Sequence, residues 1–446
     1  MADFRPFRGL RYRQDLAGSL GDVIAPPFDV ISAEAQEALH ERSPYNVVRL
    51  EYGRDDGVAG VNRYRRAAET LARWRVAGVL GLDDRPAFYL YEQQFDHGGR
   101  TYRRRSILGR VRLEPWDAGV VLPHEHTMSG PKQDRLRLLR ACRTDISPVF
   151  SLYRSDAGQA VRVCEGAAAG VTPDEATDSS GGRHRLWVID DAEALQRLER
   201  HFQDRALYIA DGHHRYETAL SYRDERQAAE AQWSGDEPEN FVLMALTAAD
   251  DPGLLILPIH RVVLPMTQPT DLRTALSDAF AVSAPPPRLG EGPLVPLLEQ
   301  LGAAEGLACV LGGLGIDRSR PLLLTLRDRA AAERLMPRGT SAAWKRLDVN
   351  VLQYGLLQPL LGIDIETVRA GGYVEFTESA EEALEAVEQG RAPLAFLLNP
   401  TRPEEIFAVA DAGERMPPKS TYFYPKLGTG LVLYALDANP VSALPF

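Results

Sequence analysis

Cysteine is scarce in this chain, with three residues among 446, at Cys142, Cys164 and Cys309. Their number is odd, and their wide separation matches neither a disulfide framework nor the close spacing of a structural zinc site. The first residues of the chain also lack the apolar core of a secretion signal. These absences together favour a reducing, cytoplasmic environment.

Long apolar runs and an excess of positive charge are also missing. No stretch approaches the roughly 20 apolar residues that a membrane span needs. The net charge of −11 argues against broad binding to nucleic acid, which needs a basic face. We therefore expect neither a membrane nor a nucleic-acid partner. A small anionic ligand in a local basic pocket is compatible with this charge, and the number of subunits is not indicated.

Internal repeats, a Walker-type glycine-rich loop and a protein-kinase signature are absent as well. The length indicates two or three domains, and mixed helical and strand-like patterns predict an α/β (α+β) protein with a mixed-sheet core. The pattern divides the chain into an N-terminal α/β segment at 1–115 and a core at 116–265. An accessory α/β domain follows at 266–365. A C-terminal segment at 366–446 then returns to the core.

Several local patterns predict individual strands. Phe88–Phe95 and 101–111, with a glycine turn between them, are typical of a hairpin. Val47–Glu51 begins with two β-branched valines, which predicts another strand. Phe241–Leu246 and 254–263 predict a strand pair around the turn that separates them.

The turn Asp-Gly-His-His-Arg at 211–215 is the most informative stretch. It lies between the apolar, strand-like Ala206–Ala210 and a helical pattern that begins at Tyr216. A strand–turn–helix arrangement directs the first N–H groups of the helix at the bend, which favours an anion such as phosphate. An acid, two imidazoles and a guanidinium at this bend can hold a metal ion, move a proton and clamp phosphate oxygens.

A second polar cluster, His124-Glu125-His126, lies between Pro123 and Gly130 and is therefore expected on a loop. A carboxylate flanked by imidazoles suits general-base chemistry. Binding of a metal such as zinc by the two histidines is the weaker alternative, because their spacing does not match a helical two-histidine motif. Lys132 and Arg135 follow and could neutralise anionic charge.

The third cluster is the proline-stiffened loop from Arg415 to Lys426. It contains Lys419, Ser420 and Thr421, whose ammonium and hydroxyl groups are ready donors for an anion. The alternative is a rigid loop that docks the expected last strand at 430–436. Together, the three clusters suit phosphoryl transfer, in which a protein positions the reacting groups, neutralises charge and supplies a base.

Four stretches resemble those of a bacterial and archaeal family of unknown function: Ala-Pro-Pro-Phe-Asp-Val, His-Glu-His-Thr with Gly-Pro-Lys, Asp-Gly-His-His-Arg-Tyr and Met-Pro-Pro-Lys-Ser-Thr. Three motifs are also similar to those of the ADP-dependent free-serine kinases of the ParB/sulfiredoxin superfamily. Pro123–Glu125 is similar to their Pro-His-Glu, Asp211–Arg215 to their Asp-Gly-His-His-Arg, and Pro418–Thr421 to their Pro-Lys-Thr-Thr. Tyr422–Phe423 stands where those kinases have Arg-His.

This resemblance implies a ParB/sulfiredoxin-like core and a nucleotide-dependent kinase that acts on a small hydroxyl metabolite, with a serine-like compound as the first candidate. ATP or ADP would be the donor, with Mg²⁺ held at Asp211 and Glu125 as the catalytic base. The expected catalytic set is Glu125, Asp211 and His213. The expected nucleotide and phosphate contacts are Gly212, His214, Arg215, Lys132 and Arg135. The expected substrate contacts are His124, His126, Lys419, Ser420 and Thr421.

Two other functions are compatible with the same residues. A ParB-like switch would bind or hydrolyse a nucleotide without phosphorylating a metabolite. A metal-dependent hydrolase would use His124, His126, Asp211 and His213 as ligands and catalytic groups.

Overall fold

The computed structural model describes residues 2–54, 62–127, 129–265, 272–288 and 290–437. Two compact units are present, and each is discontinuous in sequence. The first unit contains 1–123, 127–254 and 425–446, and the second contains 124–126 and 255–424. Within the described residues, no helix combines the length and the apolar character needed to cross a bilayer.

The first unit contains most of the strands and the longest helices. Its strands are β1 Phe4–Arg5, β2 Leu10–Tyr12, β3 Leu80–Leu82, β4 Phe88–His97, β5 Arg100–Arg112, β6 Val121–Leu122, β7 Thr144–Asp145, β8 Val149–Tyr153, β9 Asp174–Thr177, β10 Arg183–Ile189, β11 Leu207–Asp211, β12 Phe241–Ala248 and β21 Tyr434–Ala435. Its α-helices are α1 Gln14–Ala17, α2 Leu20–Val23, α3 Ala33–Arg42, α4 Val48–Glu51, α5 Arg63–Val76, α6 Ser129–Cys142, α7 Gln159–Ala167, α8 Ala192–Phe202 and α9 His213–Ala229.

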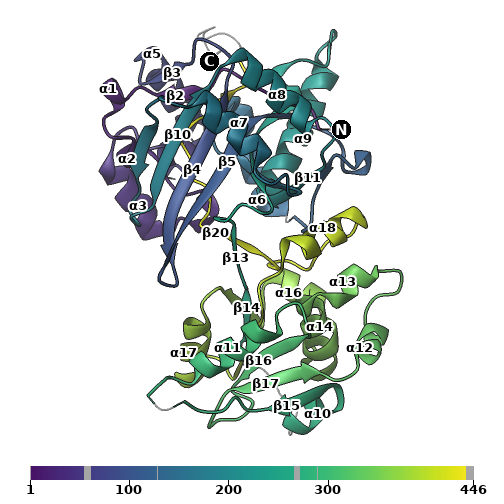
Figure 1. Ribbon diagram of the computed structural model, residues 1–446. Coiled ribbons are helices and arrows are strands. Elements are labelled where there is room, and N and C mark those ends of the chain that lie inside the picture. Colours follow the sequence, from purple (N-terminus) through teal and green to yellow (C-terminus); the bar gives the residue numbers. More distant parts are fainter. Residues whose placement is uncertain (1, 55–61, 128, 266–271, 289, 438–446) are drawn as a thin grey trace. The chain divides into compact units, whose positions relative to one another are not determined.

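The main sheet of the first unit has the strand order β6-β11-β8-β12-β5-β4-β10-β9, and β1 pairs with β5 (Figure 1). β11 runs parallel to β6 and antiparallel to β8, and β8 runs parallel to β12. β5 pairs antiparallel with both β4 and β12. The expected mixed sheet and the α/β class are therefore confirmed.

Apolar side chains from the sheet and from three helices form the core of this unit. Leu198 and Phe202 of α8, Cys164 of α7 and Tyr216 of α9 are all buried in it. Tyr216 also donates a hydrogen bond from its hydroxyl to the carbonyl of Glu114 at 2.8 Å. Burial of this first turn holds the start of α9 in place, and α6 packs against the same helix.

The second unit is built around a smaller sheet. Its strands are β13 Leu255–Leu257, β14 His260–Val263, β15 Phe280–Ser283, β16 Val310–Leu314, β17 Leu322–Leu326, β18 Val374–Thr377, β19 Leu394–Leu397 and β20 Tyr422–Tyr424. Its α-helices are α10 Leu272–Ala279, α11 Leu294–Ala304, α12 Arg329–Leu335, α13 Ala342–Arg346, α14 Asp348–Leu352, α15 Gln358–Leu361, α16 Ile365–Ala370, α17 Ala380–Glu388 and α18 Pro403–Asp411.

This second sheet has the order β15-β17-β16-β19-β14-β18, with antiparallel neighbours throughout. α11 and α17 contribute Leu297 and Ala383 to its core. β13 pairs with β20 in a separate antiparallel ribbon, which carries the chain to and from the loop that contains Lys419. The sequence patterns did not predict this ribbon.

The hairpin expected at 88–111 is confirmed as β4 and β5, but two strand predictions are wrong. Val48–Glu51 forms the short helix α4, because the buried Asn46 side chain accepts a hydrogen bond from the Val48 N–H at 2.9 Å and starts a helical turn. The predicted pair at 241–246 and 254–263 does not form either. β12 is already paired on both edges, with β5 and β8, so β13 pairs elsewhere.

The two units differ from the four segments expected at 1–115, 116–265, 266–365 and 366–446. The chain leaves the first unit after Leu254, and 366–424 lies in the second unit, since β18 and β19 complete the second sheet. Residues 425–446 belong to the first unit.

Candidate functional site

The turn at Asp211 has the predicted strand–turn–helix form. β11 ends at Asp211, Gly212 is the N-cap residue with φ of 91°, and α9 begins at His213. A Cβ atom at position 212 would lie 2.9 Å from Arg215 Nε. The left-handed backbone therefore favours glycine, and a side chain here would displace the guanidinium that folds back over it.

Two cations flank the Asp211 carboxylate. Arg215 Nη2 lies 2.8 Å from Oδ2, and Lys426 Nζ lies 2.5 Å from Oδ1. Burial would raise the pKa of Asp211, but the two cations outweigh it and hold the pKa well below its ordinary value. Asp211 is therefore an ionised anchor for a lysine and an arginine.

Lys426 also connects this turn to the N-terminal Pro-Pro-Phe-Asp stretch, because its Nζ lies 4.0 Å from Asp29 Oδ2. A further cation is close by. Arg104 is almost completely buried, donates to the carbonyl of Pro425 at 2.6 Å and lies over the ring of Phe150. Burial lowers the pKa of Arg104 to about 10, partly offset by carboxylates that include Asp211. A positive environment therefore surrounds the bend.

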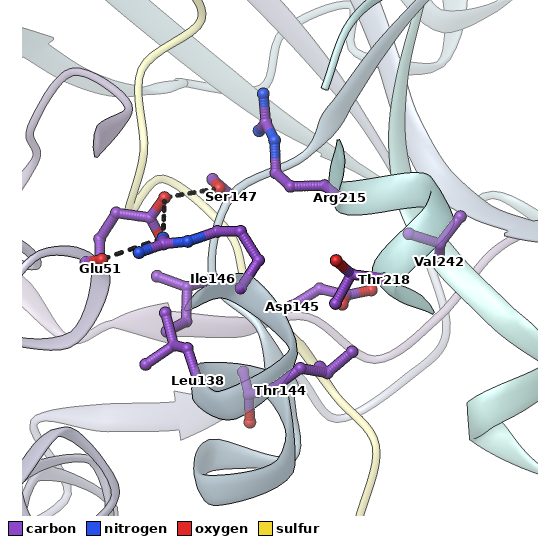
Figure 2. A pocket seen from close by; sticks show the side chains of 11 residues that line it. Glu51, Leu138, Thr144, Asp145, Ile146, Ser147, Arg215, Thr218 and Val242 are labelled. Atoms are coloured by element: carbon purple, nitrogen blue, oxygen red, sulfur yellow. Dashed lines mark hydrogen bonds and ion pairs between the residues drawn. The ribbon is translucent and has the colours of Figure 1, made fainter. Parts of the chain in front are cut away.

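A small cavity of about 40 Å³ lies beside the stem of Arg215 (Figure 2). Glu51 on its wall accepts a hydrogen bond from Ser147 at 3.1 Å and pairs with Arg135 at 3.3 Å. Arg135 is buried, also contacts Asp134, and lies 3.9 Å from the ring centroid of Phe28. These protein partners give Arg135 a structural position, which argues against its predicted contact with phosphate.

The remaining residues predicted for this unit lie on or near α9. His213 is buried, whereas His214 is half-buried, and burial lowers its pKa. Lys132 Nζ pairs with Glu217 Oε2 at 2.9 Å. Thr127 donates to the same Glu217 oxygen at 2.6 Å. Lys132 is thus held against the first two turns of α9.

In the second unit, the His-Glu-His loop and the Pro-Lys-Ser-Thr loop are hydrogen-bonded to each other. The backbone N–H of Lys419 donates to Glu125 Oε1 at 2.9 Å. His124 Nε2 lies 2.9 Å from Thr421 Oγ1, and the carbonyl of His124 accepts from the Met416 N–H at 2.7 Å. Two motifs separated by 294 positions therefore form one cluster, which we call the Glu125 cluster.

Arg261 supports the Glu125 cluster from β14. This buried arginine donates to the carbonyl of Lys419 at 3.0 Å and to that of Ile259 at 2.5 Å. Burial lowers its pKa to about 10, and the charge of Glu125 partly offsets that effect. Lys419 itself has a positive φ of 61°, a strained conformation for a residue with a side chain. Its exposed ammonium group is thus presented on a loop that Arg261 fixes.

Two predicted substrate contacts have other positions. The Ser420 side chain is buried, and its hydroxyl donates to the carbonyl of Pro417 at 2.7 Å, so it stabilises its own loop. His126 is exposed, whereas His124 is fully buried and lies edge-on to Phe423. Within this loop pair, Glu125, Lys419 and Thr421 also retain solvent exposure.

The structure thus places the predicted residues in two clusters. His124, Glu125 and His126 lie in the second unit with Lys419–Thr421, whereas Asp211–Arg215, Lys132 and Arg135 lie in the first. The sequence placed Lys426 in the third cluster without a role of its own, and it did not single out Arg104 or Arg261 as a site residue. A signal existed for Lys426, since only four of the 51 basic residues are lysines and three of these lie in or beside the motifs.

The groups around Asp211 decide whether the predicted magnesium ion can bind there. Mg²⁺ needs oxygen ligands that are open to it, and here Arg215 and Lys426 occupy one carboxylate oxygen each. In the described residues, no group of three or more His, Cys, Asp or Glu side chains could hold a metal ion. The groups at Asp211 therefore do not fit a protein-held metal.

Comparison with solved structures gives neighbours at low identity. One is a mutant free serine kinase in complex with ADP, with 12% identity and a TM-score of 0.34, covering 73% of this chain and 92% of that one. Another is a conserved hypothetical protein from Pyrococcus furiosus, with 13% identity and a TM-score of 0.32, covering 73% and 95%. A third is C-terminally truncated SbnI from Staphylococcus aureus, with 12% identity and a TM-score of 0.32, covering 74% and 90%.

Comparison with sequences gives the family. No curated protein matches the chain. Residues 4–350 match the family model described as a protein of unknown function (DUF1015). Because this match spans well over half of the chain, the protein belongs to the DUF1015 family.

Proposed function

We propose that this protein is a nucleotide-dependent kinase that phosphorylates the hydroxyl group of a small metabolite. A serine-like compound is the first candidate for the acceptor, and ATP or ADP is the donor. Any magnesium arrives with the nucleotide and is part of the substrate, since the groups around Asp211 do not fit a protein-held ion.

The observation that carries this proposal is the hydrogen bond from the Lys419 N–H to Glu125. It joins a carboxylate to a loop that also offers an ammonium group and the Thr421 hydroxyl. Phosphoryl transfer to an alcohol needs this combination: a base for the hydroxyl proton, and a cation and donors for the transferred group.

Glu125 is assigned the role of base. As the acceptor oxygen forms a bond to the terminal phosphorus, its proton passes to a carboxylate oxygen of Glu125. The bond between that phosphorus and the bridging oxygen of the nucleotide breaks, and the electron pair leaves with the shortened nucleotide. Lys419 and Thr421 interact with the oxygens of the transferred group, with His124 holding the Thr421 hydroxyl.

The cluster around Asp211 is assigned to the nucleotide phosphates. Arg215 and His214 supply charge and donors. The first N–H groups of α9 also supply donors, because the N-cap residue Gly212 has no side chain to cap them. His213 is buried at the helix start and is assigned to positioning. Lys132 remains a candidate for charge neutralisation, although it is paired with Glu217.

A ParB-like nucleotide switch is the second candidate. The observation that favours it is that Asp211, Arg215 and Lys426 form a cluster within the first unit alone. A switch binds or slowly hydrolyses its nucleotide and makes no phosphorylated metabolite, so product analysis separates the two functions.

The test incubates purified full-length protein with ATP or ADP, Mg²⁺ and a panel of amino and hydroxy acids, and follows the reaction by phosphorus NMR. We expect a phosphomonoester signal from one or more acceptors. The Glu125→Gln variant keeps the size of the side chain and an acceptor for the Lys419 N–H, and we expect its rate to fall by about 10²-fold or more. Product formation by this variant at the wild-type rate would remove Glu125 from the mechanism. Inorganic phosphate without phosphomonoester would favour the switch.

A further inference from the structure

The residue that pairs with Asp211 in place of a metal is a lysine, and it comes from a distant part of the chain. We propose that Lys426 is the resident cation of the Asp211 turn and a direct ligand of the nucleotide phosphates, with Asp211 as its positioning residue. This inference rests on the proposed binding of a nucleotide and deepens it.

The geometry around the carboxylate is the first support. The 2.5 Å contact from Lys426 to Oδ1 and the 2.8 Å contact from Arg215 to Oδ2 place one cation on each oxygen. The Lys426 ammonium group donates to Asp211 and also lies 4.0 Å from Asp29 Oδ2. The Lys426 side chain keeps 13% of its exposure, so it is not sealed off from a ligand.

The choice of residue type is the second support. Arginine supplies nearly all basic residues of this chain, and only four of the 51 are lysines. Lysine is a compact point charge that binds phosphate oxygens without a fixed planar geometry, whereas arginine binds a carboxylate or a phosphate through a rigid planar fork. Both Lys426 and Arg215 contact Asp211, and the lysine is better suited to a phosphate group that moves during transfer.

The anchoring of Lys426 is the third support. The preceding residue, Pro425, accepts a hydrogen bond from the buried Arg104, which also donates to Gln93 Oε1 at 2.5 Å. The backbone N–H of Gly428 lies 3.4 Å from the hydroxyl of Tyr91. The main chain on both sides of Lys426 is thus tied to β4 and β5, and the ammonium position is fixed before any ligand binds. Such preorganisation lowers the entropic cost of phosphate binding.

The first experiment measures nucleotide affinity without divalent metal. ADP and ATP are titrated calorimetrically into the full-length protein in EDTA and, separately, in Mg²⁺. We expect wild-type protein to bind in EDTA, and Lys426→Met to weaken that binding by about tenfold or more, as for loss of a charge-assisted contact. Lys345→Met, a lysine of α13 outside both clusters, is the matched control and should bind as wild type. Equal affinity of Lys426→Met and wild type in EDTA contradicts the inference.

The second experiment needs no nucleotide. Mn²⁺ binding to the nucleotide-free protein is followed by electron paramagnetic resonance. We expect no Mn²⁺ site that depends on Asp211 in wild type, and a new one in Lys426→Met that Asp211→Asn abolishes. Mn²⁺ held by wild type and lost in Asp211→Asn overturns the inference, even if Lys426→Met fails to fold.

The two proposals fail in different ways. Nucleotide binding through Lys426 without any phosphomonoester leaves this inference standing and removes the kinase. If the wild-type protein forms a phosphomonoester but Lys426→Met binds ADP in EDTA as tightly as wild type, the kinase stands and this inference fails. If no nucleotide binds in either buffer, both the proposed function and the role of Lys426 as a phosphate ligand fall.

Discussion

In the first unit Asp211 lies between two cationic side chains, whereas in the second unit Glu125 accepts a hydrogen bond from a main-chain N–H. Asp211 is the last residue of β11, Glu125 lies three residues after β6, and both come from motifs rich in histidine. Their surroundings nevertheless differ in charge. Two cations contact Asp211 directly and fix it in its ionised form, whereas Glu125 accepts from a main-chain N–H and interacts with the charge of Arg261.

This difference separates two tasks that a phosphotransferase must perform. A carboxylate that is clamped by lysine and arginine serves to position cations for an anion. A carboxylate that is oriented by a main-chain group keeps its capacity to take up a proton. Histidine-rich motifs of similar appearance in the sequence can therefore support different chemistry.

Removal of the Asp211 charge is expected to have the largest effect. Asp211→Asn leaves Lys426 and Arg215 without their shared counter-charge, and we expect the free energy of unfolding in urea to fall by about 2 kcal/mol or more. The double variant Asp211→Asn/Lys426→Met should lose less than the sum of the single variants. Strict additivity would mean that the two side chains do not interact.

Gly212→Ala probes how tightly the turn is packed. The left-handed backbone and the 2.9 Å approach to Arg215 Nε predict a loss of about 2 kcal/mol in unfolding free energy. Gly119→Ala is the control, because Gly119 has φ of +66° and open space around it. The control should lose only the strain contribution of about 1 kcal/mol. Equal losses at the two positions would show that Arg215 does not pack over Gly212.

Asp145, on the cavity wall beside Arg215, gives a pH-dependent comparison. Burial raises its pKa from 3.8 to about 7. Between these two values the folded protein retains a proton that the unfolded chain releases, so this group lowers stability as the pH rises. Asp145→Asn removes the effect and keeps an acceptor for the Leu243 N–H. Thermal melts should show its stability relative to wild type improving by about 2 kcal/mol from pH 5 to pH 8. A difference that is independent of pH would show that Asp145 has an ordinary pKa.

Lys419→Gly tests whether the second unit stores strain at its loop. Glycine relieves the positive φ, so unfolding of this variant should require about 0.5–1 kcal/mol more free energy than unfolding of Lys419→Ala. Both variants lack the ammonium group and should lose phosphoryl transfer alike. If Lys419→Gly is no more stable than Lys419→Ala, the positive φ of Lys419 does not cost stability.

Local pattern was enough to predict the elements nearest the chemistry. The strand–turn–helix at Asp211 follows from an apolar run, a glycine and a helical pattern that are adjacent in the sequence. The hairpin of β4 and β5 follows in the same way from alternation around a glycine turn. Both features depend on residues that are neighbours in the sequence.

The partners of the site residues could not be predicted in this way. Lys426 is 215 positions from Asp211, and Lys419 is 294 positions from Glu125. Burial of Arg104 and Arg261 depends on strand pairing across the whole of each unit. The strand predicted at Val47–Glu51 was wrong for a local reason: a single hydrogen bond from the Val48 N–H to the Asn46 side chain outweighs β-branched propensity.

The contrast between the two carboxylates is tested most directly by the phosphorus NMR spectrum of the Glu125→Gln protein with donor nucleotide and an accepted substrate. We predict that the nucleotide signals shift and broaden as they do with wild type, because the Asp211 cluster is intact. We also predict that no phosphomonoester accumulates. A spectrum in which phosphomonoester grows at the wild-type rate, or in which the nucleotide signals stay at their free positions while they shift with wild type, contradicts these predictions.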